Sequence, residues 1–303
     1  VSAARLRGRG LEKGSDQAAV DAMRRELNRL PIDGTVVIGE GEIDEAPMLY
    51  IGEKVGNKNG PKVDIAVDPL EGTTLCAKNM PGAIATIAMA DGGTLLHAPD
   101  CYMDKIAIGP GYEEGLVDLD ASPADNLNAL ARAKGVDVSE ITACILDRPR
   151  HAKLIESVRE SGAAIRLIGD GDIAGVIHTS NSGETGIDIY MGIGGAPEGV
   201  LAAAALRCIG GQMQGRLHPM NDQHRARVAE IGIEDIDRKY TMEDMASGDV
   251  LFAATGVTSG SMLQGVKFGH HGVQTETVVM RAKTQTVRWI RTTHGAAKAS
   301  GVS

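Results

Sequence analysis

The segment IAVDPLEGTT, residues 65–74, places two carboxylates and two hydroxyls directly after an apolar run. Asp68 and Glu71 are three residues apart and enclose Pro69, and proline is unfavourable inside a central strand. We therefore expect the strand to end here and the chain to turn, so that both carboxylates face one point. If Thr73 opens the next helix, its backbone N–H and its hydroxyl can contact a phosphate group.

Further acids follow other apolar runs or open expected helices. They are Asp16, then Glu40 with Glu42, Asp44 and Glu45 in GEGEIDE, and Glu198 in GIGGAPEGV. Hard cations such as Mg²⁺ need several oxygen ligands, which acids from several strand ends can supply together. Each acid alone is more often a helix cap or a solvated charge, whereas their joint occurrence beside glycines favours a metal site. A metal site with more than one ion and a set of ordinary caps both remain open at this point.

Two further segments could contact a sugar phosphate. Arg148-Pro149-Arg150 follows the apolar run TACIL, and paired arginines suit bidentate phosphate contact; the alternative is a solvated loop with a helix cap. Gly169-Asp170-Gly171-Asp172 follows another apolar run and suits hydrogen bonding to sugar hydroxyls, with a helix N-cap as the alternative. The glycines of residues 192–199 lack GxGxxG spacing and a Walker lysine, so we exclude dinucleotide binding.

Composition limits the class of protein. The 303 residues are 43% hydrophobic and 23% charged, with a net charge of −9. This balance argues against a nucleic-acid or anionic-membrane partner. No apolar run approaches the roughly 18–20 residues of a membrane span. The four cysteines form no CxxC pair, which favours a reducing, cytoplasmic location over a disulfide framework.

Hydrophobic periodicity indicates an α/β fold with a partly parallel sheet. Helices are expected over residues 16–30, 124–133, 152–161, 172–178 and 197–209, and strands over 35–39, 62–67, 82–89, 142–146, 164–168 and 187–192. The tail from Val250 to Arg291 is strand-rich. A soft boundary near Ser139 separates an N-terminal subdomain, residues 1–139, from a C-terminal subdomain, residues 140–303.

Several of these segments resemble a known family. DPLEGT resembles the DPxxGT signature of the lithium-sensitive, metal-dependent phosphatases, which include inositol monophosphatases. Longer segments, in order over almost the whole chain, are similar to class II fructose-1,6-bisphosphatase. They are GTVVIGEGEIDEAPMLYIGEKVG, VDIAVDPLEGTT, APDCYMDKIAIGPG, ILDRPRHAKLI, GDGDIAG, GIGGAPEGV and ATGVTSGSMLQGV.

The resemblance implies a layered αβαβα sugar-phosphatase fold. It also implies hydrolysis of fructose 1,6-bisphosphate to fructose 6-phosphate with Mn²⁺ or Mg²⁺, in gluconeogenesis or the Calvin cycle. By this resemblance the metal ligands are Asp16, Glu40, Asp68, Glu71 and Glu198. Thr73 activates the attacking water, and we expect Glu40 or Asp68 to share its proton. The substrate contacts are Glu71, Gly72, Thr73, Tyr102, Arg148, Pro149, Arg150, Asp170, Gly171, Asp172 and Gly195.

The chain departs from the family pattern in places. In GRGLEK the lysine, Lys13, is displaced by one position, and Arg148 stands where some members have lysine. EGTTLCAKN, with Cys76, is closer to forms from photosynthetic bacteria that also accept sedoheptulose 1,7-bisphosphate. The alternatives are a phosphatase of inositol phosphates or 3′-phosphonucleotides and an inactive regulatory module that binds sugar phosphates. We expect a cytoplasmic homo-oligomer, a dimer or a tetramer.

Overall fold

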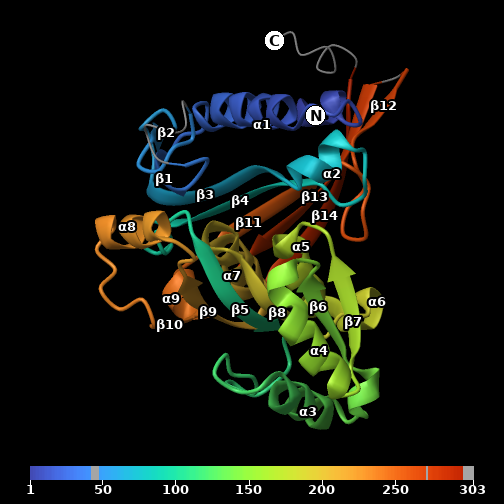
Figure 1. Cartoon of the computed structure of the whole chain (residues 1–303). Coiled ribbons are helices and arrows are strands. Elements are labelled where there is room, and N and C mark those ends of the chain that lie inside the picture. Colours follow the sequence, from blue (N-terminus) through green and yellow to red (C-terminus); the bar gives the residue numbers. More distant parts are fainter. Residues whose placement is uncertain (42–47, 271, 296–303) are drawn as a thin grey trace. The chain divides into compact units, whose positions relative to one another are not determined.

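The computed structural model describes residues 1–41, 48–270 and 272–295 (Figure 1). The chain forms two compact units. Unit 1 comprises Val1–Gly93 and Leu251–Ser303, and unit 2 comprises Thr94–Val250. These limits differ from the boundary expected near Ser139, which lies inside unit 2. The reason is that the C-terminal strands return to the N-terminal sheet, where Leu251–Gly256 pairs antiparallel with residues 84–89.

Unit 1 is built on an eight-stranded sheet in the order β12-β13-β11-β4-β3-β1-β2, with β14 paired to β13. The strands are β1 (Asp33–Ile38), β2 (Lys54–Val55), β3 (Lys62–Glu71), β4 (Ile84–Asp91), β11 (Leu251–Gly256), β12 (Lys267–Gly269), β13 (Gly272–Arg281) and β14 (Thr286–His294). Only β1 and β3 are parallel; the other pairings are antiparallel. The helices of unit 1 are η1 (Ala3–Leu6), α1 (Glu12–Leu27) and α2 (Thr73–Ala77).

Helix α1 covers one face of this sheet through its apolar positions (Figure 1). Val20 and Leu27 belong to a buried cluster with Val36 of β1 and Ile65 and Val67 of β3. In β1 the buried positions alternate with partly exposed ones, as expected for a strand with one fully covered face. This packing fixes α1, and with it Asp16, against the strands that carry the other acids of unit 1.

Strand β3 continues beyond the point at which the sequence predicted its end. Its pairing shifts so that Asp68 lies opposite Thr86 and Glu71 opposite Ile84, which leaves one extra residue on β3 and makes a bulge. The neighbouring β1 pairs with β3 only as far as Ala66, so the missing N–H of Pro69 breaks no ladder bond to β1. The expectation that the strand stops at Pro69 is therefore wrong, because a bulge accommodates the proline.

Unit 2 is a three-layer α/β arrangement around a six-stranded sheet in the order β10-β9-β5-β8-β6-β7. The strands are β5 (Tyr102–Ile108), β6 (Thr142–Leu146), β7 (Ala164–Ile168), β8 (Ile189–Gly195), β9 (Gln212–His218) and β10 (Lys239–Thr241). The helices are α3 (Pro123–Lys134), α4 (Ala152–Glu160), α5 (Asp172–His178), α6 (Ser182–Thr185), α7 (Ala196–Ile209), α8 (Asp222–Glu230) and α9 (Met242–Met245). Short 3₁₀ helices are η2 (Val138–Glu140), η3 (Pro149–His151) and η4 (Thr179–Asn181).

The two faces of the unit 2 sheet are covered by different helices. Leu127 of α3 and Val158 of α4 pack with Ile145 and Ile189 on one face. On the other face α5 approaches closely at Gly175, where an added Cβ would lie 3.3 Å from both Cys144 and Tyr190. Strand β6 is parallel to β7 and β8, while β5 is antiparallel to β8 and β9. The predicted α/β class and the partly parallel sheet are confirmed.

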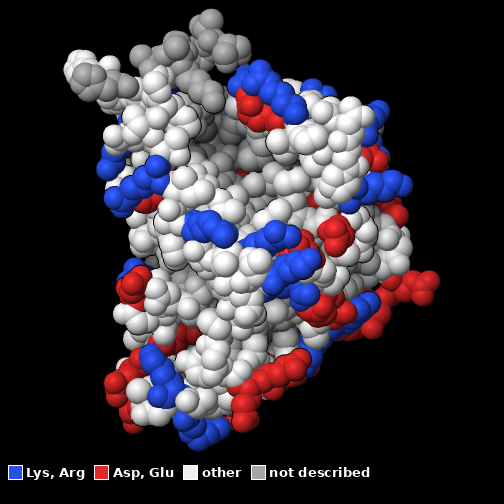
Figure 2. Space-filling view, turned by 180° about the vertical axis from the view of Figure 1, so that it is seen from behind, with Lys and Arg blue, Asp and Glu red and all other residues white. Residues whose placement is uncertain are grey.

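The described surface carries mixed charge. On the face drawn in Figure 2, basic and acidic side chains are interspersed. Among the described residues, no helix is both long enough and apolar enough to cross a bilayer.

Candidate active site

The segment from Asp68 to Thr73 forms the bulged end of β3 and the start of α2. The backbone N–H of Leu70 donates to Asp68 Oδ1 at 3.0 Å, which holds that carboxylate beside its own backbone. Glu71 is buried. Gly72 then adopts a left-handed conformation with φ of 82°, and α2 begins at Thr73. The prediction that Thr73 opens a helix is confirmed, and the left-handed turn explains why glycine precedes it.

Two further predicted ligands lie on neighbouring elements of unit 1. Asp16 is in the second turn of α1, where partial burial raises the pKa of its carboxyl. Glu40 lies two residues beyond the end of β1, and its N–H donates to the carbonyl of Leu49 at 3.0 Å. The other acids of that segment, Glu42, Asp44 and Glu45, lie outside the described residues.

The donor chemistry of the predicted ligands fits a hard divalent cation. All five are carboxylates, which suit Mg²⁺ or Mn²⁺ better than metals that prefer thiolates. Four lie in unit 1, and Glu198 lies in unit 2. Within residues 1–41, 48–270 and 272–295, no group of three or more His, Cys, Asp or Glu side chains is gathered closely enough to hold an ion. The fit of these residues to a metal ion therefore rests on their carboxylate groups and on their positions near the ends of strands and the starts of helices.

Unit 2 brings Tyr102 and Arg150 into direct contact. The Arg150 guanidinium lies over the Tyr102 ring, 4.8 Å from its centroid. Its Nε and Nη2 donate to the carbonyl of Ile193 at 3.0 and 2.7 Å. Among the described residues Nη1 makes no hydrogen bond within the protein, so this end of the guanidinium can still donate to a phosphate.

His151 binds the backbone of Ile193, the residue whose carbonyl accepts the hydrogen bonds of Arg150. Its Nδ1 lies 2.7 Å from the carbonyl of Leu146, and its Nε2 accepts from the N–H of Ile193 at 2.8 Å. These contacts require a neutral ring that donates through Nδ1. Burial, as the largest cause, lowers the pKa of His151 and favours that neutral form.

The glycines of residues 192–195 belong to β8 rather than to a loop. Strand β5 pairs along the whole of β8, with Tyr102 opposite Gly195, and α7 starts immediately afterwards at Ala196. The strand expected to end at residue 192 therefore continues to Gly195. Its glycines make room for acids: an added Cβ would lie 2.1 Å from Asp172 Oδ2 at Gly194 and 1.8 Å from Glu198 Oε2 at Gly195.

A buried lysine balances these two acids. Lys105 of β5 is 1% exposed, forms an ion pair with Asp172 and donates to the carbonyl of Gly195 at 2.9 Å. Burial raises the pKa of Glu198 to about 7, the Asp172 carboxylate adds to this rise, and the Lys105 ammonium opposes it. A buried carboxylate with a raised pKa gains stability as an anion when a cation binds to it.

The remaining predicted contacts lie on the loops around this strand end. Gly171 has φ of 86° and precedes α5, and its N–H donates to Asp170 Oδ1 at 3.1 Å. Arg148 and Pro149 begin η3, and Arg148 Nη1 donates to the carbonyl of Asp147 at 3.0 Å. Unit 2 thus brings Tyr102, Arg150, Asp172, Gly195 and Glu198 together at the end of β8, with Arg148 and Asp170 on flanking loops.

Sequence reasoning missed Lys105, His151 and His224. The ring centroids of His224 and Tyr102 are 5.8 Å apart. Lys105 carries a recognisable signal, since it is a lone cation in the otherwise apolar second half of YMDKIAI. A charged residue in a buried strand requires a partner. His151 and His224 carry no comparable signal, because their roles depend on backbone and ring positions set by the fold.

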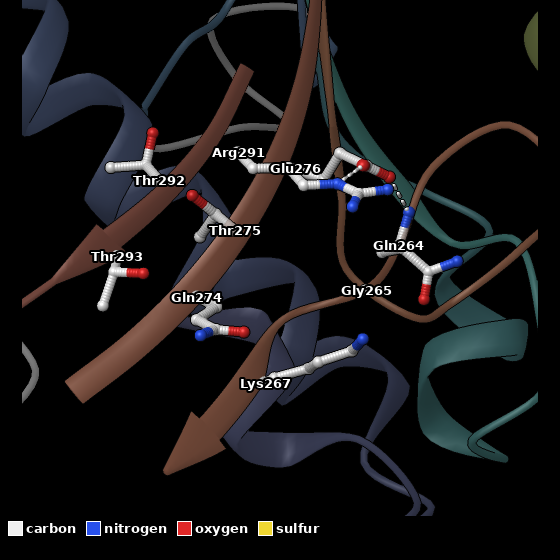
Figure 3. A pocket seen from close by; sticks show the side chains of 9 residues that line it. All are labelled: Gln264, Gly265, Lys267, Gln274, Thr275, Glu276, Arg291, Thr292 and Thr293. Atoms are coloured by element: carbon white, nitrogen blue, oxygen red, sulfur yellow. Dashed lines mark hydrogen bonds and ion pairs between the residues drawn. The ribbon is translucent and has the colours of Figure 1, made fainter. Parts of the chain in front are cut away.

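Two cavities of unit 1 lie away from the predicted site residues. The cavity in Figure 3, of about 250 Å³, is lined by residues of β12, β13, β14 and the preceding loop. A second, of about 520 Å³, lies beside α1 and includes Val1 and Arg5. Neither is lined by a predicted site residue.

The Lys105–Asp172 ion pair generates a stability prediction. Lys105→Met should lower the free energy of unfolding by about 3–5 kcal/mol, because it leaves a buried carboxylate without its cation. Adding Asp172→Asn should recover most of this loss. Urea denaturation followed by far-UV circular dichroism measures both variants. A loss below about 1 kcal/mol for Lys105→Met would contradict the role of this ion pair, since that is the range of an exposed pair.

Comparison with known proteins identifies the family. The family model described as "Bacterial fructose-1,6-bisphosphatase, glpX-encoded" matches residues 1–294. Two proteins named "D-fructose 1,6-bisphosphatase class 2/sedoheptulose 1,7-bisphosphatase", from Synechococcus sp. strains JA-3-3Ab and JA-2-3B'a(2-13), are each 46% identical to this chain over 319 residues, which cover 97% of this chain and 91% of the relative. A protein of the same name from Prochlorococcus marinus strain MIT 9303 is 44% identical over 308 residues, covering 97% and 92%. The chain therefore belongs to the bacterial class II fructose-1,6-bisphosphatase family of phosphatases.

Proposed function

We propose that this phosphatase hydrolyses the 1-phosphate of fructose 1,6-bisphosphate and accepts sedoheptulose 1,7-bisphosphate as a second substrate. The observation that carries the proposal is 46% identity over 97% of the chain to relatives named for both reactions. Every carboxylate, hydroxyl and guanidinium group assigned below is present in the sequence. We further propose that the enzyme acts in the cytoplasm as a homo-oligomer.

The family implies a divalent metal ion, and we propose Mg²⁺ or Mn²⁺ as its identity. The proposed ligands are Asp16, Glu40, Asp68, Glu71 and Glu198. Such an ion, when bound, lowers the pKa of a water molecule and offsets the charge of the transferring phosphoryl group. The raised pKa of Glu198 supports its assignment, because the fold holds that carboxyl in surroundings where its negative charge is costly without a cation.

We assign Thr73 to positioning the attacking water and receiving its proton. A threonine hydroxyl is a weak base, so it must pass its own proton to a carboxylate, and Glu40 or Asp68 is the proposed acceptor. The position of Thr73 supports this role, because it follows the left-handed Gly72 at the start of α2 and its side chain is only partly buried. The neighbouring Thr74 differs, since its hydroxyl donates to Glu12 at 3.1 Å.

Substrate positioning is assigned mainly to unit 2. Arg150 has a free Nη1 among the described contacts and is held in place by Ile193 and Tyr102, so we propose it as the anchor of the second phosphate. Asp170 and Asp172 are proposed to accept hydrogen bonds from sugar hydroxyls. Asp172 can do so while paired with Lys105, because a carboxylate accepts several hydrogen bonds.

The first experiment tests the substrates and the metal. We expect the purified protein to release phosphate from both bisphosphates with Mg²⁺ or Mn²⁺, and to lose activity when the metal is chelated. Inositol monophosphate and a 3′-phosphonucleotide serve as comparison substrates. A kcat/KM for either comparison substrate above that for fructose 1,6-bisphosphate would overturn the proposed substrate class. Absence of phosphate release from every substrate would support the regulatory alternative.

The second experiment compares adjacent threonines. Thr73→Ala should lower kcat by about 10²- to 10⁴-fold, the usual range for loss of proton-transfer catalysis, with little change in KM. Thr74→Ala should retain most of kcat, because its hydroxyl forms an exposed contact to Glu12. Steady-state kinetics with fructose 1,6-bisphosphate separates the two parameters. Equal effects of the two substitutions would remove Thr73 from its proposed role.

The third experiment tests Glu198 as a metal ligand by substituting Gly195, whose added Cβ would displace the Glu198 carboxylate. Gly195 has φ of −64° and ψ of 144°, which alanine adopts without strain, so Gly195→Ala acts only by adding a Cβ 1.8 Å from Glu198 Oε2. We expect the Mn²⁺ concentration for half-maximal activity to rise by about 10- to 100-fold. Gly183→Ala is the control, because no atom lies within 4 Å of its added Cβ. A rise in substrate KM at unchanged metal dependence would instead assign the site to substrate contact alone.

A further inference from the structure

Strand β14 forms a long outer edge of the unit 1 sheet (Figure 1). All nine of its residues, Thr286–His294, pair with β13 on one side. On its other side no strand pairs with it within the described parts of the chain. The opposite edge of the sheet ends differently, in β2, which has only two residues. Long unprotected edges are templates for pairing with another chain, and proteins usually shorten or block them.

The side chains of β14 combine exposed apolar groups with two arginines, Arg288 and Arg291. Trp289 is the only tryptophan in the sequence, and it is 63% exposed. Ile290 is 43% exposed. The strand contains no proline or glycine, and threonine, valine and isoleucine make up much of the rest, which are residues typical of paired strands. The large apolar side chains of Trp289 and Ile290 therefore lie exposed on a strand whose outer edge has no partner among the described residues.

The backbone of β14 restricts how a second copy could pair with it. In an antiparallel ladder, two directly opposed residues are either bonded to each other or both turned away. Along β14, every second residue points its N–H and C=O groups at β13, and the residues between them point outward, where a second copy could bind. Two opposed residues of paired β14 strands must both point outward or both point inward. Their residue numbers are therefore both odd or both even. This rule excludes the alignment that would place Arg288 against Arg291 of the other copy.

The full-length alignment satisfies the rule and is symmetric. Its centre is Ile290, the middle residue of Thr286–His294, so the Ile290 side chains of the two copies oppose each other. Arg288 then opposes Thr292, and Trp289 opposes Arg291 of the other copy. No like charges are opposed, and each tryptophan ring faces a guanidinium at cross-strand distance, an arrangement that favours cation–π attraction.

Arg291 is already oriented for this contact. Its Nε lies 2.5 Å from Glu276 Oε1, and Glu276 is anchored in turn by the N–H of Gln264 at 2.6 Å (Figure 3). The Arg291 side chain is nevertheless 81% exposed. Trp289 lies on the same face of the strand, two residues away. The ion pair therefore holds a solvent-accessible guanidinium at the sheet edge, where an aromatic ring of a second copy can cover it.

We propose that two copies of this chain associate through β14, paired antiparallel about a two-fold axis at Ile290. The two unit 1 sheets then form one continuous sheet, and the two-fold symmetry makes each β14 complementary to itself. This proposal rests on the proposed homo-oligomer and specifies the surface through which its copies associate. It uses no proposed catalytic or metal-binding residue, so it can fail while the proposed phosphatase activity stands.

The test uses charge at the centre of the interface. Ile290→Lys places two lysines directly opposite each other, which is unfavourable. We expect sedimentation velocity to show that this substitution halves the mass of the oligomer, from dimer to monomer or from tetramer to dimer. Leu251→Lys is the matched control, because Leu251 is also 43% exposed but lies on β11, an inner strand. It should keep the unsubstituted mass, and circular dichroism checks that both variants fold.

Symmetry gives a rescue experiment. Ile290→Glu should also halve the mass, whereas a mixture of the Lys and Glu variants should regain the full mass, because opposite charges then meet at the axis. Trp289 is a second reporter: as the only tryptophan, its emission should shift to longer wavelength when the unsubstituted oligomer is diluted and dissociates. A monomeric unsubstituted protein, unchanged mass in both Ile290 variants, or failure of the mixture to reassociate would overturn the proposal. If β14 instead pairs with a different protein, the purified unsubstituted protein would be monomeric, which is the first of these outcomes.

Discussion

The antiparallel pairing of β11 with β4 is the constraint on which the rest of the structure depends. It returns the chain to its first sheet after the whole of unit 2 has been formed, and it places β11 between β4 and β13. The bulged end of β3 pairs with the other side of β4. The strand that carries Asp68 and Glu71 is therefore supported by residues more than 160 positions later in the chain, so the geometry of these acids requires the complete sheet.

A second constraint is the need to neutralise buried charge. Unit 2 places Lys105 and Asp172 out of solvent, with Glu198 close to both. Buried charges are tolerated only when they are paired and hydrogen-bonded. Lys105 satisfies Asp172 and the carbonyl of Gly195, and this leaves Glu198 with a raised pKa. A single buried lysine thus stabilises Asp172 as an anion, while burial and the Asp172 charge still raise the pKa of Glu198.

Local pattern predicts much of this fold because most elements follow simple periodicity. The strands at residues 142–146 and 164–168 were predicted with the limits of β6 and β7. The helix at residues 172–178 was predicted with the limits of α5. The path of β3 could not be predicted in the same way, because a bulge at Pro69 depends on which neighbour the strand has on each side. The boundary near Ser139 failed to anticipate the two units for a related reason, since the return of β11 is a non-local pairing.

The glycines of β8 show how far sequence reasoning can reach at the candidate site itself. The glycines of residues 192–199 lack the spacing of a dinucleotide-binding loop, and on that ground the sequence predicts no dinucleotide site. In the fold, however, the space left by Gly194 and Gly195 is taken by the carboxylates of Asp172 and Glu198. Neither contact has a sequence signal, because Asp172 lies on a different element and Glu198 lies one helical turn away. These glycines are therefore best understood as the positions that let two acids approach one strand end, while Lys105 supplies the charge that makes this approach stable.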